Sequence, residues 1–302
     1  MPINIGIPRA LLYHEFGSLW TAFFSKLGVP FTLSAETNTQ ILDHGTMLAI
    51  DESCLPLKIY LGHIASLLPK CTHIFAPRIA GYHNNFFLCA KFAGLPDIIR
   101  NTFSLADNQL IAPNIENKSQ STQLKAIYSI CQTIGISKIS GCLAYHQAKQ
   151  TWKNHNSAPT HSNTQIAIIG HSYLLNDAFF CRDILTVLKK RNLTMITSEH
   201  IPSKVLYQQA AIFRPDIYWQ LSAKLAGATR YFSQLSEIKG IIMVSSFGCG
   251  PDSLMNEYLE HHVLKNSNTP YLIINLDEHT GSAGIVTRVE AFLDLMNWRS
   301  ES

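Results

Sequence analysis

Three of the cysteines stand where a reactive or metal-binding thiol is expected, next to a helix start or a strand end. Cys54 lies in DESCLPLK and Cys249 in SFGCGPDS, and each precedes a proline that suits the first turn of a helix. Cys89 lies in CAKFAGLPD, after a strand that ends in APR. Free amides at a helix start favour a thiolate or a sulfide-rich cluster. Gly248 and Gly250 leave room for the backbone to approach a bulky inorganic ligand.

The cysteine spacing by itself leaves two interpretations open. The sequence contains 7 cysteines and no Cys-x-x-Cys pair, which excludes ferredoxin-type spacing and most zinc ribbons. Any metal site must therefore be assembled from distant segments. A single cysteine is more often a small buried hydrophobe. Cys131 and Cys181, in helical patterns, and Cys71, before a strand, fit that role, whereas Cys142 falls in a loop-like stretch.

Other polar side chains follow strand-like segments and are candidates for catalysis or binding. Glu278 and His279 follow one apolar run and His171 follows another, so each is a candidate to transfer protons near a cluster. Helix capping and loop hydrogen bonds explain these residues equally well. Arg9 and Arg78 each follow a proline at a strand end, where they could bind a carboxylate or phosphate or pair with Asp or Glu.

Alternation of strands and helices along both halves of the chain positions these residues. Ligands of parallel sheets bind beyond the carboxyl ends of the strands, where the candidate residues fall. We expect an α/β protein with two doubly wound, Rossmann-like domains, parallel sheets and an inter-domain cleft. The predicted strands are 3–7, 31–34, 73–79, 165–170, 193–197, 240–245 and 271–276, and the predicted helices are 14–27, 39–50, 56–68, 123–134, 177–190, 203–213, 251–264 and 283–296.

The domain boundary is predicted in a polar stretch near the middle of the chain. Residues 149–165 are rich in Asn, Ser, His, Thr and Pro and hold few large apolar side chains. We therefore expect an N-terminal domain over 1–150, a linker over 151–164 and a C-terminal domain over 165–302.

Composition narrows the class of protein. The chain has 302 residues, 46% of them hydrophobic and 15% charged, which favours folded domains over disorder. The net charge of +3 is spread without a dense basic run, so no nucleic-acid partner is indicated. No signal peptide or membrane-spanning apolar run is apparent, and the expected location is the cytoplasm.

Five phrases of the sequence resemble one known family. They look like the acyl-CoA dehydratase activase-related family, which belongs with the 2-hydroxyacyl-CoA dehydratases and double-cubane-cluster proteins. Two departures are visible: Ala90 follows Cys89 where the family usually has proline, and Ser172 stands in GHSY where the family usually has GHPY. The five phrases are IGIPRALLY, DESCLPLK, CAKFAGLPD, SFGCGPDS and DEHTGSAGIVTRVEAF.

The resemblance implies an iron–sulfur protein. Cys54, Cys89 and Cys249 are expected to hold a 4Fe–4S cluster, alone or as part of a double cubane, for low-potential reductive chemistry. That chemistry would be radical dehydration of a 2-hydroxyacyl-CoA, a lyase reaction, or reduction of a small molecule. A separate ATP-dependent activase is the expected partner, because no Walker-type phosphate loop occurs in the sequence. A second copy of the chain or a related subunit is a further possible partner.

Three alternatives to this function stay open at the level of sequence. The chain could be a non-catalytic iron–sulfur scaffold or electron carrier for another subunit. It could also be a cluster-free binding protein with structural cysteines. Zinc is the rival metal, with His279 or Asp252 as a fourth ligand beside the three thiolates.

Overall fold

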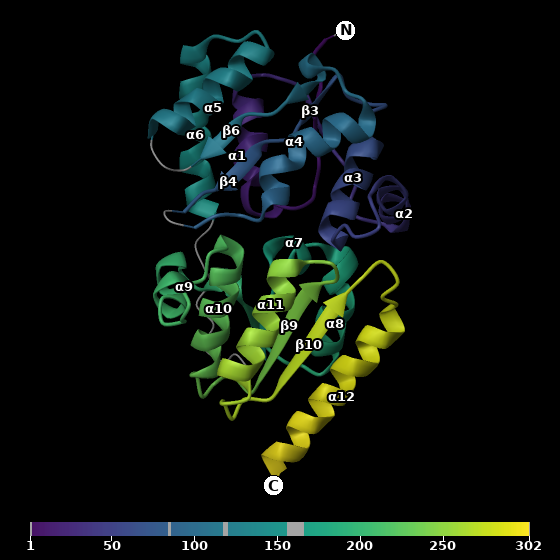
Figure 1. Cartoon of the computed structure of the whole chain (residues 1–302), viewed down its shortest axis with the longest axis vertical. Helices are drawn as coiled ribbons and strands as arrows, with labels where there is room; N and C mark the ends of the chain where they lie inside the picture. Colours follow the sequence, from purple (N-terminus) through teal and green to yellow (C-terminus); the bar gives the residue numbers. More distant parts are fainter. Residues whose placement is uncertain (1, 84–85, 117–119, 156–165, 302) are drawn as a thin grey trace. The chain divides into compact units, whose positions relative to one another are not determined.

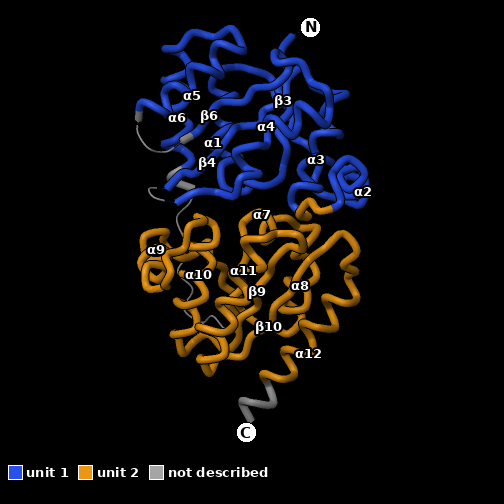
Figure 2. The backbone as a smooth tube through the Cα atoms, in the orientation of Figure 1, with its two compact units in different colours: residues 1–51, 56–157 blue, residues 52–55, 158–302 orange. Residues whose placement is uncertain are grey.

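The chain folds into two compact units. The computed structural model describes all residues except 1, 84–85, 117–119, 156–165 and 302 (Figure 1). Unit 1 comprises residues 1–51 and 56–157, and unit 2 comprises residues 52–55 and 158–302 (Figure 2). The short segment 52–55 therefore belongs to unit 2, although the chain on both sides of it belongs to unit 1. Of the predicted linker, residues 151–155 end a helix, 156–164 lie outside the described residues, and the linker stays a prediction.

Unit 1 is built on four parallel strands in the order β2-β1-β3-β5. These are β1 (Ile5–Ile7), β2 (Phe31–Leu33), β3 (His73–Phe75) and β5 (Leu110–Ile111), and a small parallel pair is formed by β4 (Arg78–Gly81) and β6 (Asn114–Glu116). The helices are α1 (Tyr13–Lys26), α2 (Thr39–Leu48), α3 (Leu55–Leu67), α4 (Ala90–Phe103), α5 (Gln120–Thr133) and α6 (Lys138–His155), with a 3₁₀ turn, η1 (Asp107–Gln109).

The unit 1 core forms where the strands meet the apolar stripe of α1. Trp20, Phe23 and Phe24 recur at helical spacing and are buried against Ile5 and Phe75. The side chains of α5 and α6 pack on the same cluster. Because α6 contributes small residues to it, α6 packs closely although most of its side chains are polar.

Two glycines let α2 and α3 cross at close range. A Cβ added at Gly45 would lie 1.8 Å from the Lys58 carbonyl oxygen, and one at Gly62 would lie 1.9 Å from the Ile41 carbonyl oxygen. No side chain fits at either position. The close crossing packs α2 directly against α3, which is buried along most of its length.

Unit 2 is also built on four parallel strands, in the order β10-β9-β7-β8. They are β7 (Ile166–Ile169), β8 (Met195–Thr197), β9 (Gly240–Ser246) and β10 (Tyr271–Leu276). The helices are α7 (Ser172–Leu175), α8 (Ala178–Lys190), α9 (Ser203–Ala210), α10 (Gln220–Ser233), α11 (Gly250–Leu259) and α12 (Ser282–Glu301), with a 3₁₀ turn, η2 (Ser198–His200), and a π-helical turn, η3 (Glu260–Leu264).

The two central strands of unit 2 are buried on both faces. Every residue of β7 and β9 is buried, as a continuous apolar run predicts for a central parallel strand. Ile169 and Met243 belong to the core cluster formed with α10 and α11. Both strands therefore lie inside the core of unit 2, and the residues that follow their carboxyl ends include His171 and Cys249.

The two sheets share one topology. When the strands are numbered within each unit, both sheets have the order 2-1-3-4. The direction in which successive strands are added to the sheet therefore reverses beside β1 in unit 1 and beside β7 in unit 2. The predicted α/β class with parallel, Rossmann-like sheets is confirmed, while the predicted cleft between domains stays a prediction. In such sheets a ligand binds beyond the carboxyl ends of the strands at the reversal. Among the described residues, no helix is both long and apolar enough to cross a membrane.

Candidate functional site

A buried histidine and a buried carboxylate meet at the reversal point of unit 2. His171 follows β7, and Asp252 lies in the first turn of α11, just after β9. His171 Nε2 lies 2.6 Å from Asp252 Oδ1, and the side chains are 5% and 1% exposed. Tyr173 packs beside the imidazole, with ring centroids 5.0 Å apart. The pair is a short, water-excluded hydrogen bond at the place where this topology puts ligands.

The pairing fixes what His171 can do. In the tautomer that carries its proton on Nε2, His171 donates to Asp252 Oδ1, and Nδ1 is then the acceptor nitrogen of the imidazole. A carboxylate that orients a histidine in this way supports general acid–base chemistry. Asp252 Oδ2 and Ser246 Oγ are also buried there and have no hydrogen-bond partner within the described part of the chain. Such atoms are uncommon in protein interiors, so they mark this edge of unit 2 as a buried polar site.

Cys54 and Cys249 lie on neighbouring segments of unit 2. The Leu55 amide donates to the Phe247 carbonyl oxygen at 3.4 Å, which holds the segment 52–55 against the loop after β9. Gly248 has a φ of +74°, and a Cβ added there would lie 3.1 Å from the Cys54 Cα atom. Glycine is therefore required at this position for two reasons: the left-handed backbone and the contact with Cys54.

Both cysteines precede helices, as the sequence predicts. Cys54 immediately precedes α3, and Cys249 is the N-cap residue of α11, with its carbonyl oxygen accepting from the Ser253 amide at 3.0 Å. Both side chains are half-buried. Cys89 is the N-cap residue of α4 in unit 1. The structure thus brings the Cys54 and Cys249 segments together in one unit and places Cys89 in the other, so the three-cysteine ligand set stays a prediction.

Glu278 and His279 lie in the loop between β10 and α12. The Asp277 carboxylate accepts from the His279 amide at 2.9 Å and from the Thr280 hydroxyl at 2.7 Å, while that hydroxyl accepts from the Asp277 amide at 2.8 Å. These bonds stabilise the loop before α12. Because β10 pairs with β9, the loop lies at the same edge of the sheet as His171, and the catalytic roles of Glu278 and His279 stay predictions.

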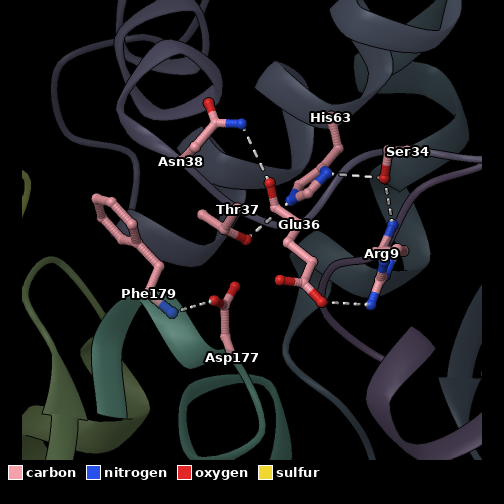
Figure 3. A network of polar contacts seen from close by, with 8 residues as sticks. All are labelled: Arg9, Ser34, Glu36, Thr37, Asn38, His63, Asp177 and Phe179. Atoms are coloured by element: carbon pink, nitrogen blue, oxygen red, sulfur yellow. Dashed lines mark hydrogen bonds and ion pairs between the residues drawn. The ribbon is translucent and has the colours of Figure 1, made fainter. Parts of the chain in front are cut away.

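The matching edge of unit 1 holds a second polar network, which the sequence analysis missed. His63 is fully buried, with Nδ1 2.8 Å from Ser34 Oγ and Nε2 3.1 Å from Thr37 Oγ1 (Figure 3). The Arg9 amide donates to Ser34 Oγ at 2.8 Å, and the Arg9 guanidinium lies 3.4 Å from Glu36. The contact between the buried His63 of helix α3 and the loop residue Ser34 could have been predicted only if the strand order had been known.

Burial keeps the histidines of this network neutral. Burial, and to a smaller extent the nearby His14 and Arg9, together lower the pKa of His63 to about 3. The pKa of His14 falls to about 4, chiefly through burial and secondarily through Arg9. The network therefore has the character of a structural hydrogen-bond lattice around Arg9 rather than a proton-transfer site.

Arg78 has a structural role in unit 1. Its guanidinium lies 2.7 Å from the Asp97 carboxylate and also donates to the Ala93 carbonyl oxygen, which ties β4 to α4. Of the two alternatives for this arginine, the structure therefore shows the ion pair. Arg9 also has an acidic partner, Glu36.

A small apolar pocket lies beyond the ends of β1 and β3 in unit 1. Its volume is about 50 Å³, and its walls include Pro8, Leu11, Tyr60, Pro77 and Leu95. It occupies the reversal point of this sheet, as the His171–Asp252 pair does in unit 2. The two units thus carry chemically different features at equivalent places, apolar in unit 1 and acid–base in unit 2.

A comparison with known protein families finds one family that matches the chain. The family model described as "CoA enzyme activase uncharacterised domain (DUF2229)" matches residues 4–201, more than half of the sequence. The chain belongs to this family. The match covers the unit 1 sheet and continues through β7 and β8 of unit 2. A comparison with curated proteins found no match.

The family corrects the function predicted from the cysteine motifs. The chain is a member of an activase family, so its assignment to the dehydratase and double-cubane superfamily, and with it the iron–sulfur redox function, is wrong. The physical reason is visible in the part of the chain that the structure describes: no three His, Cys, Asp or Glu side chains there are grouped to hold a metal ion. The activase-related character is supported, and an activase-family protein acts with a protein partner.

Proposed function

We propose that this activase-family chain acts on a separate CoA-dependent enzyme and promotes its conversion to the active state. The observation that supports this proposal is the family match over residues 4–201. An activase by name changes the state of another protein, so the substrate is an enzyme rather than a free metabolite. The partner is then the CoA enzyme itself, in place of the separate activase that the sequence suggested.

We infer that the functional centre is the carboxyl edge of unit 2. His171, oriented by Asp252, could take and return a proton through Nδ1, and the pair follows directly after the buried strands β7 and β9. Phe247 and Leu254 flank Cys249 in sequence and are 61% and 65% exposed. Large exposed apolar side chains beside a polar site favour contact with a protein partner.

The experiment is a reconstitution of the activation. A CoA-thioester dehydratase from the same organism is assayed in its resting form, with and without the purified chain, and each mixture is tested with and without ATP. We expect turnover to rise on addition of the chain in at least one of the two mixtures. Heat-denatured chain is the control. Unchanged turnover in both mixtures contradicts the proposal, whatever the chain binds.

A further inference from the structure

The contact between the Cys54 and Cys249 segments has a consequence beyond activation. Gly248 has no Cβ, so its backbone packs directly on the Cys54 backbone, and the Leu55–Phe247 hydrogen bond fixes that approach. Cys249 is the next residue after Gly248. The two cysteines therefore lie on backbone segments in direct contact, with Cys249 one residue beyond the contact. A disulfide between them requires their Cα atoms to come within about 4–7 Å.

Accessibility separates these two cysteines from those in the cores. Cys54 and Cys249 are half-buried. Cys131 and Cys181 are 0% and 2% exposed, and burial raises the pKa of both thiols, that of Cys181 to about 12. Thiolates react with disulfides and thiols do not, so the core cysteines are protected both by burial and by protonation.

We propose that Cys54 and Cys249 form a reversible disulfide by exchange with a low-molecular-weight disulfide such as oxidised glutathione. In the first step one cysteine thiolate attacks the glutathione disulfide, whose S–S bond breaks and releases one glutathione thiolate. In the second step the other cysteine thiolate attacks the mixed disulfide and releases the second glutathione. The two cysteines lose two electrons and two protons, and one oxidised glutathione becomes two reduced ones.

The disulfide would act on a segment at which the chain passes between the units. Residues 52–55 belong to unit 2, and α3 continues from them into unit 1. A bond from Cys54 to Cys249 replaces a weak backbone contact by a covalent link, so it secures the start of α3 to the loop after β9. Oxidation would thereby fix the segment beside the His171–Asp252 pair, and reduction would release it.

The test is disulfide mapping of the full chain. The protein is incubated with oxidised glutathione, its remaining thiols are alkylated, and proteolytic peptides are identified by mass spectrometry. We expect a cross-linked peptide pair containing Cys54 and Cys249, lost after treatment with dithiothreitol. Cys249→Ser and, independently, Cys54→Ala should each abolish the cross-link, and Cys181→Ser should leave it intact.

The competing outcomes are distinguishable. Cys142 lies close enough to Cys131 to raise the pKa of the Cys131 thiol, so this pair is an internal comparison. A cross-link between Cys131 and Cys142 without one between Cys54 and Cys249 overturns the proposal. Stable glutathione adducts on Cys54 or Cys249 singly, with no cross-link, overturn it as well. Neither outcome bears on the activation of a CoA enzyme, which is assayed separately.

Discussion

His171 Nε2 lies 2.6 Å from Asp252 Oδ1, although 81 positions separate the two residues in the sequence. The sheet explains the encounter. β7 and β9 are parallel neighbours with Ile169 opposite Met243, so the loops that leave them emerge side by side. A parallel sheet thus converts two distant strand ends into one site.

Loss of the buried carboxylate should destabilise the protein strongly. In Asp252→Ala, His171 loses its partner in a site that water does not reach, and we expect a loss of about 3 kcal/mol in the free energy of unfolding. Urea denaturation followed by circular dichroism measures it. The matched control is Asp294→Ala, which removes a 3.0 Å ion pair with Arg191 whose carboxylate is 65% exposed. That variant should change the free energy of unfolding by no more than about 0.5 kcal/mol. Equal losses in the two variants would show that the buried pair stabilises the protein no more than an exposed ion pair does.

Adding a methyl group at Gly248 should disturb the contact with Cys54. Gly248→Ala imposes a left-handed backbone on alanine and places a Cβ 3.1 Å from the Cys54 Cα atom, so we expect a loss of about 1–2 kcal/mol. Gly250→Ala is the control, because a Cβ there meets nothing within 4 Å. Thermal unfolding of both variants compares them. A Gly248→Ala protein as stable as the wild type would mean that the contact is absent in solution.

The neutral His63 predicts how stability depends on pH. Its pKa in the folded protein, about 3, lies below the ordinary value of 6.5, so the unfolded state binds the proton first as the pH falls. The contribution of the neutral His63 to the free energy of unfolding is fully present above pH 6.5. It is lost progressively as the pH falls towards 3. At pH 5 the expected loss from this histidine is about 2 kcal/mol.

Urea denaturation between pH 5 and pH 8 measures this dependence. His63→Gln should lose part of the slope, whatever its absolute stability, and the exposed His279→Gln should keep all of it. His14, whose pKa is also lowered, adds to the slope of the wild type and of both variants. An unchanged slope in His63→Gln would contradict the buried, neutral state assigned to that side chain.

The sequence predicted those elements whose burial pattern is regular. The uniformly apolar run at 240–245 became β9, and the amphipathic run at 177–190 became α8. The run at 73–79 was expected to be one strand interrupted late by Pro77, and the interruption is complete: the run divides into β3 and β4, in different sheets, with Pro77 between them. Pro77 has no amide to donate to a ladder, which explains the break.

Helices with few large apolar residues escaped prediction. Helix α6 was missed, and Cys142, expected in a loop, lies within it. Its buried positions include Ala144 and Ala148, small residues that fit against α1 but leave no strong apolar period. Helix α10 buries Ser222 and Thr229 among its core residues, so its inward face does not look apolar in the sequence.

The sequence pointed to His171 and Asp252 as separate residues, but it did not predict that they pair. His171 was expected after a strand and the three cysteines at strand ends or helix starts. The structure places His171 after β7 and the cysteines directly before the helices α3, α4 and α11. The bond from His171 to Asp252 depends on β9 lying next to β7, and strand order within a sheet is set by packing of the helices across both faces. The same holds for His63 and Ser34, which meet where α3 packs against the residue that follows β2.

The most direct test of activation by this chain is the turnover of a resting CoA-thioester dehydratase. The turnover is measured after addition of the wild-type chain or of His171→Gln. Glutamine keeps a polar side chain but cannot exchange a proton, and folded fraction is checked by circular dichroism in both proteins. We predict that the wild-type chain raises the turnover and that His171→Gln, at equal folded fraction, raises it far less. Unchanged turnover with the wild-type chain would contradict the activation of a CoA enzyme, and equal activation by both proteins would remove His171 from its mechanism.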